Sequence, residues 1–296
     1  METIKLNSID DYNKLFGLKT YHPLVSVIDM KEAVRSVNHV RMDYGVYALF
    51  LKNDTNCTLK YGRKEYDYQE GTVVSFSPGR IIDVELKEGI VKQDVIGLMF
   101  HPDLIFGTLL GERIDSYGFF QYNEYEALHL SESERELFLD CIENIKKEVI
   151  HPVDNHSAHL IAANIHQLLE YLNRFYDRQF ITRHKVNNGI VREFEKRLKE
   201  YFESDRIRDG VPTVAYFADQ ANLSSGYFGD LIRKELGISP KTVIDNYMVR
   251  VAKQKLATTS DDVSIIAYDL GFQYPQHFSR MFKKITGKSP SAYRKA

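Results

Sequence analysis

The sequence lacks long apolar runs and has almost no cysteine. Only two cysteines, Cys57 and Cys141, occur among its 296 residues, so a disulfide framework is not expected. The first ten residues hold no apolar run that would serve as a signal peptide, and no later stretch approaches membrane-spanning length. These absences favour a cytoplasmic protein without a membrane partner.

The short motifs of common catalytic sites are also missing. There is no G-x-S-x-G, no Walker-type loop and no G-x-G-x-x-G, and neither cysteine has a charged base beside it. A metal-dependent enzyme built on a small barrel needs two or three imidazoles and usually a carboxylate around one ion. The predicted strands contain only His101, while His22 and His39 fall outside such a spacing. We therefore expect no enzyme, no metal and no cofactor.

A second group of histidines occurs in a predicted helical region: His151, His156, His159 and His166. His159 and His166 share a helical face, but the helix is apolar and we expect no acid beside them at ligand spacing. A surface or core role is the simpler interpretation.

Charge is divided unevenly along the chain, which is long enough for two domains. Residues 190–296 hold 18 Lys and Arg against 13 Asp and Glu, a net charge of +5. Residues 1–189 hold 21 against 28, a net charge of −7. This asymmetry suggests that the two parts meet different partners, although charge alone does not decide for nucleic acid over a solvated surface.

The N-terminal part predicts closely spaced strands separated by Gly, Pro and Asn turns. The predicted strands are Leu24–Asp29, Gly45–Leu51, Asn56–Tyr61, Thr72–Ser77, Ile81–Leu86 and Asp94–His101. No helical period interrupts them, so an antiparallel sandwich or barrel is expected over residues 20–101.

Helices are expected over residues 102–180. Ser131–Ile150 begins with a capping-box spacing from Ser131 to Glu134, and Ser157–Tyr176 carries a similar apolar stripe. Residues 181–189 are polar with a glycine and predict a linker. The chain is therefore predicted to be an α+β protein with domains at 1–180 and 190–296.

An internal repeat of fifty positions dominates the C-terminal domain. Gly237-Ile238-Ser239-Pro240 aligns with Gly287-Lys288-Ser289-Pro290, and Arg233-Lys234 aligns with Lys283-Lys284. The apolar positions align as well: Phe228 with Phe278, Leu231 with Met281, and Ile232 with Phe282.

Each copy of the repeat predicts a helix, a short turn and a second helix. The first copy places its helices at Val214–Gln220 and Ser225–Leu236, and the second at Ser264–Leu270 and Pro275–Thr286. A longer helix beginning at Ser239 separates them. This is the helix-turn-helix pattern, whose second helix can enter a major groove. A helical bundle with a duplicated hairpin and no DNA role is the alternative, which the basic excess disfavours.

The second copy clearly resembles the C-terminal signature of the AraC/XylS family of bacterial transcription regulators. The resemblance lies in IIAYDLGF at 265–272, HFSRMFKK at 277–284 and GKSPSAYR at 287–294. It implies a DNA-binding domain over residues 190–296, in which two helix-turn-helix units joined by a rigid helix meet successive major grooves of double-stranded promoter DNA.

The first unit matches the family pattern less well at the positions that would face the groove. Gly226 and Gly229 have no side chain there, and Asp230 accepts from a cytosine amino group but repels phosphates. We expect this unit to read few bases. The remaining candidates are Ser224, Ser225, Tyr227 and Arg233.

The second unit offers Gln276, His277 and Arg280 at the corresponding positions. Gln suits adenine and Arg suits guanine, each through a bidentate pair. Three further basic residues are expected to contact phosphates: Lys283, Lys284 and Arg294. For each of these residues a solvated helix face is the alternative.

The N-terminal region resembles, more loosely, the cupin-like ligand-binding and dimerisation domain of many family members. The resemblance lies in QEGTVVSFSPG at 69–79. Aromatic residues and one cation suit a small organic effector, or belong to an ordinary core and surface: Tyr44, Tyr47, Tyr61, Tyr66, Tyr68, Phe76 and Arg80.

The resemblance also implies a homodimer that acts on RNA polymerase. Activation is the commoner outcome in the family, and repression stays open. Glu132–Ile150 and Ser157–Tyr176 are the candidate dimer contacts, unless both of their apolar stripes are core. An effector would then act by changing how the linker positions the two DNA readers.

Overall fold

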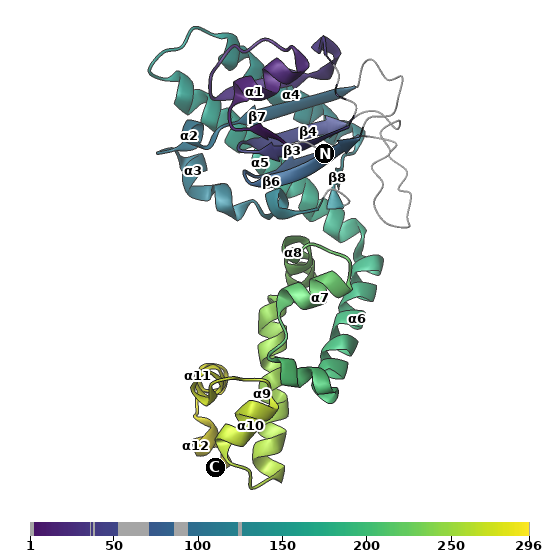
Figure 1. Cartoon of the computed structure of the whole chain (residues 1–296), viewed down its shortest axis with the longest axis vertical. Coiled ribbons are helices and arrows are strands. Elements are labelled where there is room, and N and C mark those ends of the chain that lie inside the picture. Colours follow the sequence, from purple (N-terminus) through teal and green to yellow (C-terminus); the bar gives the residue numbers. More distant parts are fainter. Residues whose placement is uncertain are drawn as a thin grey trace. The chain divides into compact units, whose positions relative to one another are not determined.

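The computed structural model describes residues 3–35, 37, 39–52, 71–85, 94–123 and 126–295. The chain forms two compact units, Met1–Ile181 and Thr182–Ala296, of which the first combines sheets with helices and the second is helical (Figure 1). No helix in the described ranges is both long and apolar enough to span a membrane.

Strands of the N-terminal unit form two sheets within the described residues. The smaller sheet has the order β1-β3-β6, with β1 (Thr3–Leu6) parallel to β3 (His39–Tyr44) and β6 (Arg80–Glu85) antiparallel to it. The larger sheet is antiparallel and has the order β2-β7-β4-β5-β8. Its strands are Val25–Asp29, Val95–Phe100, Tyr47–Lys52, Thr72–Phe76 and Leu128–His129.

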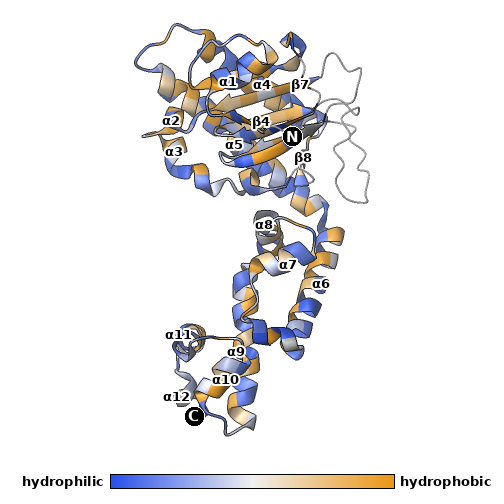
Figure 2. Ribbon diagram, viewed as in Figure 1, coloured by the Kyte–Doolittle hydropathy of each residue, from blue (hydrophilic) through white to orange (hydrophobic). Residues whose placement is uncertain are grey.

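The core of this unit lies where side chains of both sheets meet. Met42 of β3, Phe50 of β4, Phe76 of β5 and Met99 of β7 belong to one buried cluster, together with Phe16. Strands β4 and β5 are buried on both faces, and Figure 2 shows β4 and β7 as hydrophobic. Because the larger sheet is covered on both sides, its strands show apolar runs rather than alternation. The described strands form two sheets and not one closed barrel.

Helices of the N-terminal unit precede and follow the strands. They are α1 (Ile9–Phe16), α2 (Pro102–Ile105), α3 (Leu109–Arg113), α4 (Glu132–Ile150) and α5 (Ser157–Thr182), with 3-10 turns at Met30–Glu32, Ile114–Ser116 and Gly118–Gln121. The capping box predicted at the start of α4 is confirmed, since the Ser131 hydroxyl accepts from Glu134 N and the Glu134 carboxylate accepts from Ser131 N.

The apolar stripes of α4 and α5 are core. Phe138 and Ile145 on α4, and Ile161, Ile165 and Leu172 on α5, are each 0% exposed within this one unit. They therefore give no support to the idea that surplus apolar surface on these helices marks a dimer contact.

Some elements of this unit differ from the sequence prediction. The strand predicted at Asn56–Tyr61 lies outside the described residues, as do Cys57, Tyr61, Tyr66 and Tyr68. The sequence reasoning did not find β1, α1 or β3. Helix α1 starts with a capping box from Ser8 to Asp11 and ends at Gly17, whose φ is 68°, so its signals were present and were overlooked.

The predicted linker is largely helical. Helix α5 ends at Thr182, and α6 (His184–Glu203) begins after Arg183. The His184 ring Nδ1 lies 2.7 Å from the Glu235 carboxylate, and Asn187 donates to the same carboxylate at 3.1 Å. These tertiary contacts to α8 (Ser225–Leu236) stabilise a polar helix start that hydrophobic periodicity does not reveal.

The C-terminal unit is helical. Its helices are α6, α7 (Val214–Gln220), α8 (Ser225–Leu236), α9 (Pro240–Thr258), α10 (Val263–Asp269), α11 (Pro275–Thr286) and α12 (Pro290–Arg294), with a 3-10 turn, η5, at Asp205–Asp209. Helices α7, α8 and α11 have the predicted bounds, whereas α10 is shifted by one residue from the prediction.

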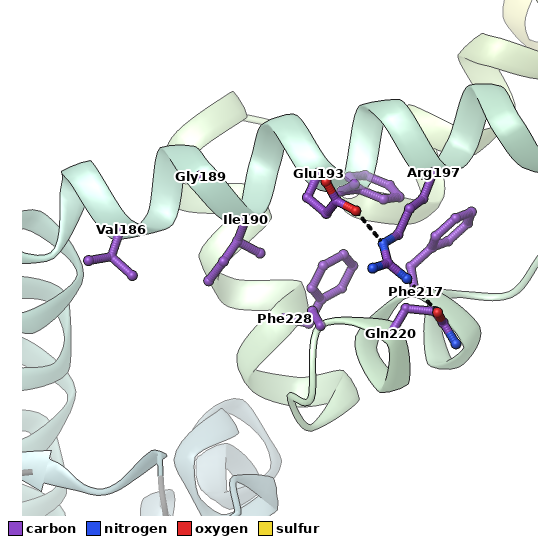
Figure 3. Close-up of a pocket in the computed structure, with 10 residues that line it drawn as sticks. Val186, Gly189, Ile190, Glu193, Arg197, Phe217, Gln220 and Phe228 are labelled. Atoms are coloured by element: carbon purple, nitrogen blue, oxygen red, sulfur yellow. Dashed lines mark hydrogen bonds and ion pairs between the residues drawn. The ribbon is translucent and has the colours of Figure 1, made fainter. Parts of the chain in front are cut away.

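Helix α6 packs along the first pair of repeat helices. Phe194 meets Phe217 of α7 and Phe228 of α8 at ring distances of 5.0 and 5.2 Å. The Arg197 guanidinium donates to Glu193 at 2.7 Å and to Gln220, so it ties α6 to α7 (Figure 3). In the cleft of Figure 3, the polar side chains Glu193, Arg197 and Gln220 already pair with each other, and the rest of the lining is mainly apolar.

Candidate DNA-binding surface

The first helix-turn-helix unit is formed by α7 and α8. The hydroxyls of Thr213 and Ser224 accept bonds from the backbone N–H groups of Tyr216 and Tyr227, so each helix has a capped first turn. Between the helices Asn222 has a φ of 54°, a left-handed conformation that reverses the chain. The turn that the sequence predicts at this position is confirmed.

The second unit is formed by α10 and α11, and its turn depends on a glycine. Gly271 has a φ of 82°, and a Cβ at this position would lie 2.7 Å from the carbonyl carbon of Gly210 and 2.9 Å from the Ile207 carbonyl oxygen. The turn therefore packs directly against the η5 backbone. Phe278 and Phe282 of α11 are fully buried beneath it.

Helix α9 runs between the two helix-turn-helix units (Figure 1). The Ser239 hydroxyl caps its first turn and Pro240 occupies the first position, as predicted. Gly237 ends α8 with a φ of 73°, and Gly287 ends α11 with a φ of 76°. The repeat thus reproduces the C-terminal ends of the two candidate reading helices.

The outward face of α11 carries polar and basic side chains. Gln276, His277 and Arg280 are exposed, as are Lys283 and Lys284 in the last turns. Positions 276, 280 and 283 share one helical face. Among the contacts within the described part of the chain, none joins these five side chains to an acidic group. The face therefore combines groups that pair with base edges and groups that pair with phosphates.

The outward face of α8 is different. Arg233 is 59% exposed, but its guanidinium donates to the Asp230 carboxylate at 2.9 Å. Ser225 is exposed, whereas the Ser224 hydroxyl serves as the helix cap. The pairing of Asp230 with Arg233 was missed at the sequence level, although their spacing of three residues places them side by side on a helix.

Two predicted contact residues take part in contacts within the C-terminal unit. Tyr227 is 4% exposed in the core of the first unit, so its side chain does not reach a base from this position. Arg294 donates to the Leu256 carbonyl oxygen at 3.4 Å, in the last turn of α9. A cation at this end of a helix stabilises its dipole, so Arg294 links α12 to α9 in addition to the phosphate contact predicted for it.

The aromatic residues proposed to line an effector site pack against one another. Tyr44 lies 5.4 Å from Phe76, and Tyr47 lies 5.0 Å from Phe100, measured between ring centroids. Arg80 donates to the Tyr122 carbonyl oxygen at 2.6 Å. Tyr44 and Phe76 are therefore part of the core of the N-terminal unit, whereas Tyr47 and Arg80 are half-buried.

The predicted absence of an acid beside the helical histidines was wrong. Glu170 follows His166 by one helical turn, its carboxylate lies 3.3 Å from His166 Nε2, and it accepts from the Tyr117 hydroxyl at 2.8 Å. The hydrogen bond from Tyr117 is the main cause that lowers the pKa of Glu170.

No group of three metal-ligating side chains occurs in the described ranges. Burial raises the pKa of the Cys141 thiol, which disfavours the nucleophilic thiolate.

The C-terminal unit matches known proteins. Residues 217–296 match the family model of a helix-turn-helix domain, HTH_18. The arabinose operon regulatory protein of Escherichia coli (strain K12) is 32% identical over 111 residues, which are 37% of this chain and 38% of that protein. The C-terminal unit is an AraC-type helix-turn-helix domain. The match spans less than half of the relative's own length.

The chain is also similar to other proteins over part of its length. The ornithine utilization regulator of Pseudomonas aeruginosa is 44% identical over 61 residues, or 21% of this chain and 18% of that protein. Among solved structures, the C-terminal domain of AraT, a response regulator from Geobacillus stearothermophilus, is 30% identical and has a TM-score of 0.33, covering 36% of this chain and 84% of that one.

Proposed function

We propose that the protein is a sequence-specific DNA-binding transcription regulator that binds promoter DNA through its AraC-type domain. Helix α11 reads bases with Gln276, His277 and Arg280, and Lys283 and Lys284 hold the phosphate backbone. Helix α8 of the first helix-turn-helix unit reads few bases.

The observation that carries this proposal is the exposed face of α11. Arg280 is exposed on that face and makes no contact with an acidic group within the described residues. Its planar guanidinium suits a bidentate pair with the O6 and N7 acceptors of guanine, and each such pair discriminates by about 1–3 kcal/mol. The names of the relatives, which are operon regulators, support a role in transcription.

The test begins with selection of a binding site from random duplexes. Binding of the full chain to the selected duplex and to a scrambled one is then measured by fluorescence anisotropy at one salt concentration. Arg280→Ala is expected to weaken binding to the selected duplex by about 5- to 150-fold and to change scrambled binding much less.

Arg250→Ala is the matched control, since Arg250 lies on α9 with its guanidinium 4.5 Å from the Tyr247 ring centroid. It removes the same charge from the same domain and is expected to leave discrimination intact. An equal loss on both duplexes for Arg280→Ala would make Arg280 a phosphate contact.

We further propose that the protein acts as a homodimer that activates transcription through RNA polymerase, and that a small organic effector binds its N-terminal unit. The support is the family resemblance, because the arabinose operon regulatory protein matches over only 37% of this chain. Sedimentation of the full chain tests the dimer. A thermal-shift screen of the full chain tests the effector, and a screen in which no metabolite stabilises the protein counts against it.

A further inference from the structure

The two candidate reading helices carry opposite charges at the same position. Asp230 of α8 aligns with Arg280 of α11 under the fifty-residue repeat, and Arg233 aligns with Lys283. Gly229 stands next to Asp230 and contributes no side chain. A DNA phosphate that approaches α8 therefore meets a carboxylate where α11 presents a guanidinium.

The contacts of Asp230 show how it acts on its neighbour. Its carboxylate accepts from the Arg233 guanidinium at 2.9 Å, and the two side chains are 28% and 59% exposed. Exposed ion pairs of this kind add little to stability. The pair therefore changes the surface of α8 more than it holds the fold together.

We propose that Asp230 sets the affinity of the first helix-turn-helix unit for DNA, by holding Arg233 away from phosphates and by repelling the backbone itself. The proposal rests on the DNA-binding function proposed above and adds a residue that weakens binding. Each phosphate that a Lys or Arg neutralises adds about 0.9 to the slope of the logarithm of affinity against the logarithm of salt concentration. If the first helix-turn-helix unit makes no such phosphate contact, more of the total binding free energy comes from the bases that α11 reads.

Asp230→Asn tests the proposal, because it removes the charge and keeps the shape of the side chain. Binding to a scrambled duplex is expected to tighten by about three- to tenfold, and the salt slope to rise by about one, between roughly 50 and 200 mM salt. The double variant Asp230→Asn/Arg233→Ala is expected to lose most of this gain, because the released arginine supplies it.

Asp245→Asn is the matched control. Asp245 of α9 pairs with Lys241 at 3.0 Å, and its removal changes the net charge of the domain by the same amount. It is expected to leave the affinity and the salt slope close to those of the wild type. Equal tightening by Asp245→Asn would show a general charge effect and overturn the proposal.

Weaker binding of Asp230→Asn to the selected duplex alone would also overturn it, since Asp230 would then be reading a cytosine. The failure of the function itself looks different. A wild-type protein that binds selected and scrambled duplexes equally would refute sequence-specific regulation, while the scrambled duplex would still report on Asp230. Thermal unfolding of each variant confirms that it is folded.

Discussion

The two helix-turn-helix units share a backbone plan but differ on the surface that faces DNA. Both bury equivalent phenylalanines, Phe228 and Phe278, and both end the second helix at a glycine in the left-handed region. On the outward face, Arg280 of α11 stands where α8 has Asp230. The two copies of the repeat share the residues that folding requires, whereas the residues proposed to meet DNA differ.

The largest expected effect tests whether the two cores are equivalent. Phe228→Ala and Phe278→Ala each remove a fully buried ring, and each is expected to cost about 3–5 kcal/mol of unfolding free energy. Hydrogen exchange resolved to individual helices measures the loss around each core. A loss of unfolding free energy several times smaller in one helix-turn-helix unit than in the other would show that the two cores are not equivalent.

The turns of the two helix-turn-helix units, unlike their cores, are expected to respond unequally to substitution. Gly271→Ala places a Cβ against the η5 backbone at a φ of 82°, so it is expected to cost about 1–3 kcal/mol. Its counterpart in the first unit, Ala221, has a φ of −89° and tolerates a Cβ.

The reciprocal change, Ala221→Gly, is therefore expected to cost no more than about 1 kcal/mol. Urea unfolding of the full chain, followed by circular dichroism, compares the two variants. Equal losses of unfolding free energy would mean that the close approach of Gly271 to the Gly210 backbone does not affect stability.

The smallest effect concerns a glycine that nothing in the fold requires. Gly229 lies inside α8, and a Cβ there would meet no atom within 4 Å. Gly229→Ala is expected to stabilise the unit by about 0.5–1 kcal/mol, because it removes the entropic cost of glycine in a helix.

Gly237→Ala serves as the control, since the space around Gly237 is equally open but its φ is 73°. Thermal unfolding of the full chain measures both variants, and Gly237→Ala is expected to destabilise the unit. Destabilisation by Gly229→Ala would show that its backbone position is constrained after all.

Much of the C-terminal unit could be predicted from the sequence, since the repeat, the serine caps and the terminal glycines are local signals. The helices at Val214–Gln220 and Pro275–Thr286 have the predicted bounds. Long-range contacts are not visible in such signals. The burial of Tyr227 and the placement of Arg294 against the Leu256 carbonyl both depend on tertiary packing.

The N-terminal unit was less predictable for the same reason. The larger sheet is covered on both faces, so its strands resemble any buried apolar run and do not reveal which sheet they join.

One part of the C-terminal unit was also hidden from the sequence. The helical start of α6 depends on Glu235, which lies 51 residues after His184 in the sequence.

The central claim is that α11 reads most of the bases and α8 reads few. Base-by-base preferences, measured by sequencing the duplexes bound from a random library, test it for the wild type, Arg280→Ala and Arg233→Ala side by side. The account predicts that Arg280→Ala relaxes the preference for guanine at one position and that Arg233→Ala leaves every base preference unchanged. A changed base preference in Arg233→Ala, or an unchanged profile in Arg280→Ala, would contradict it.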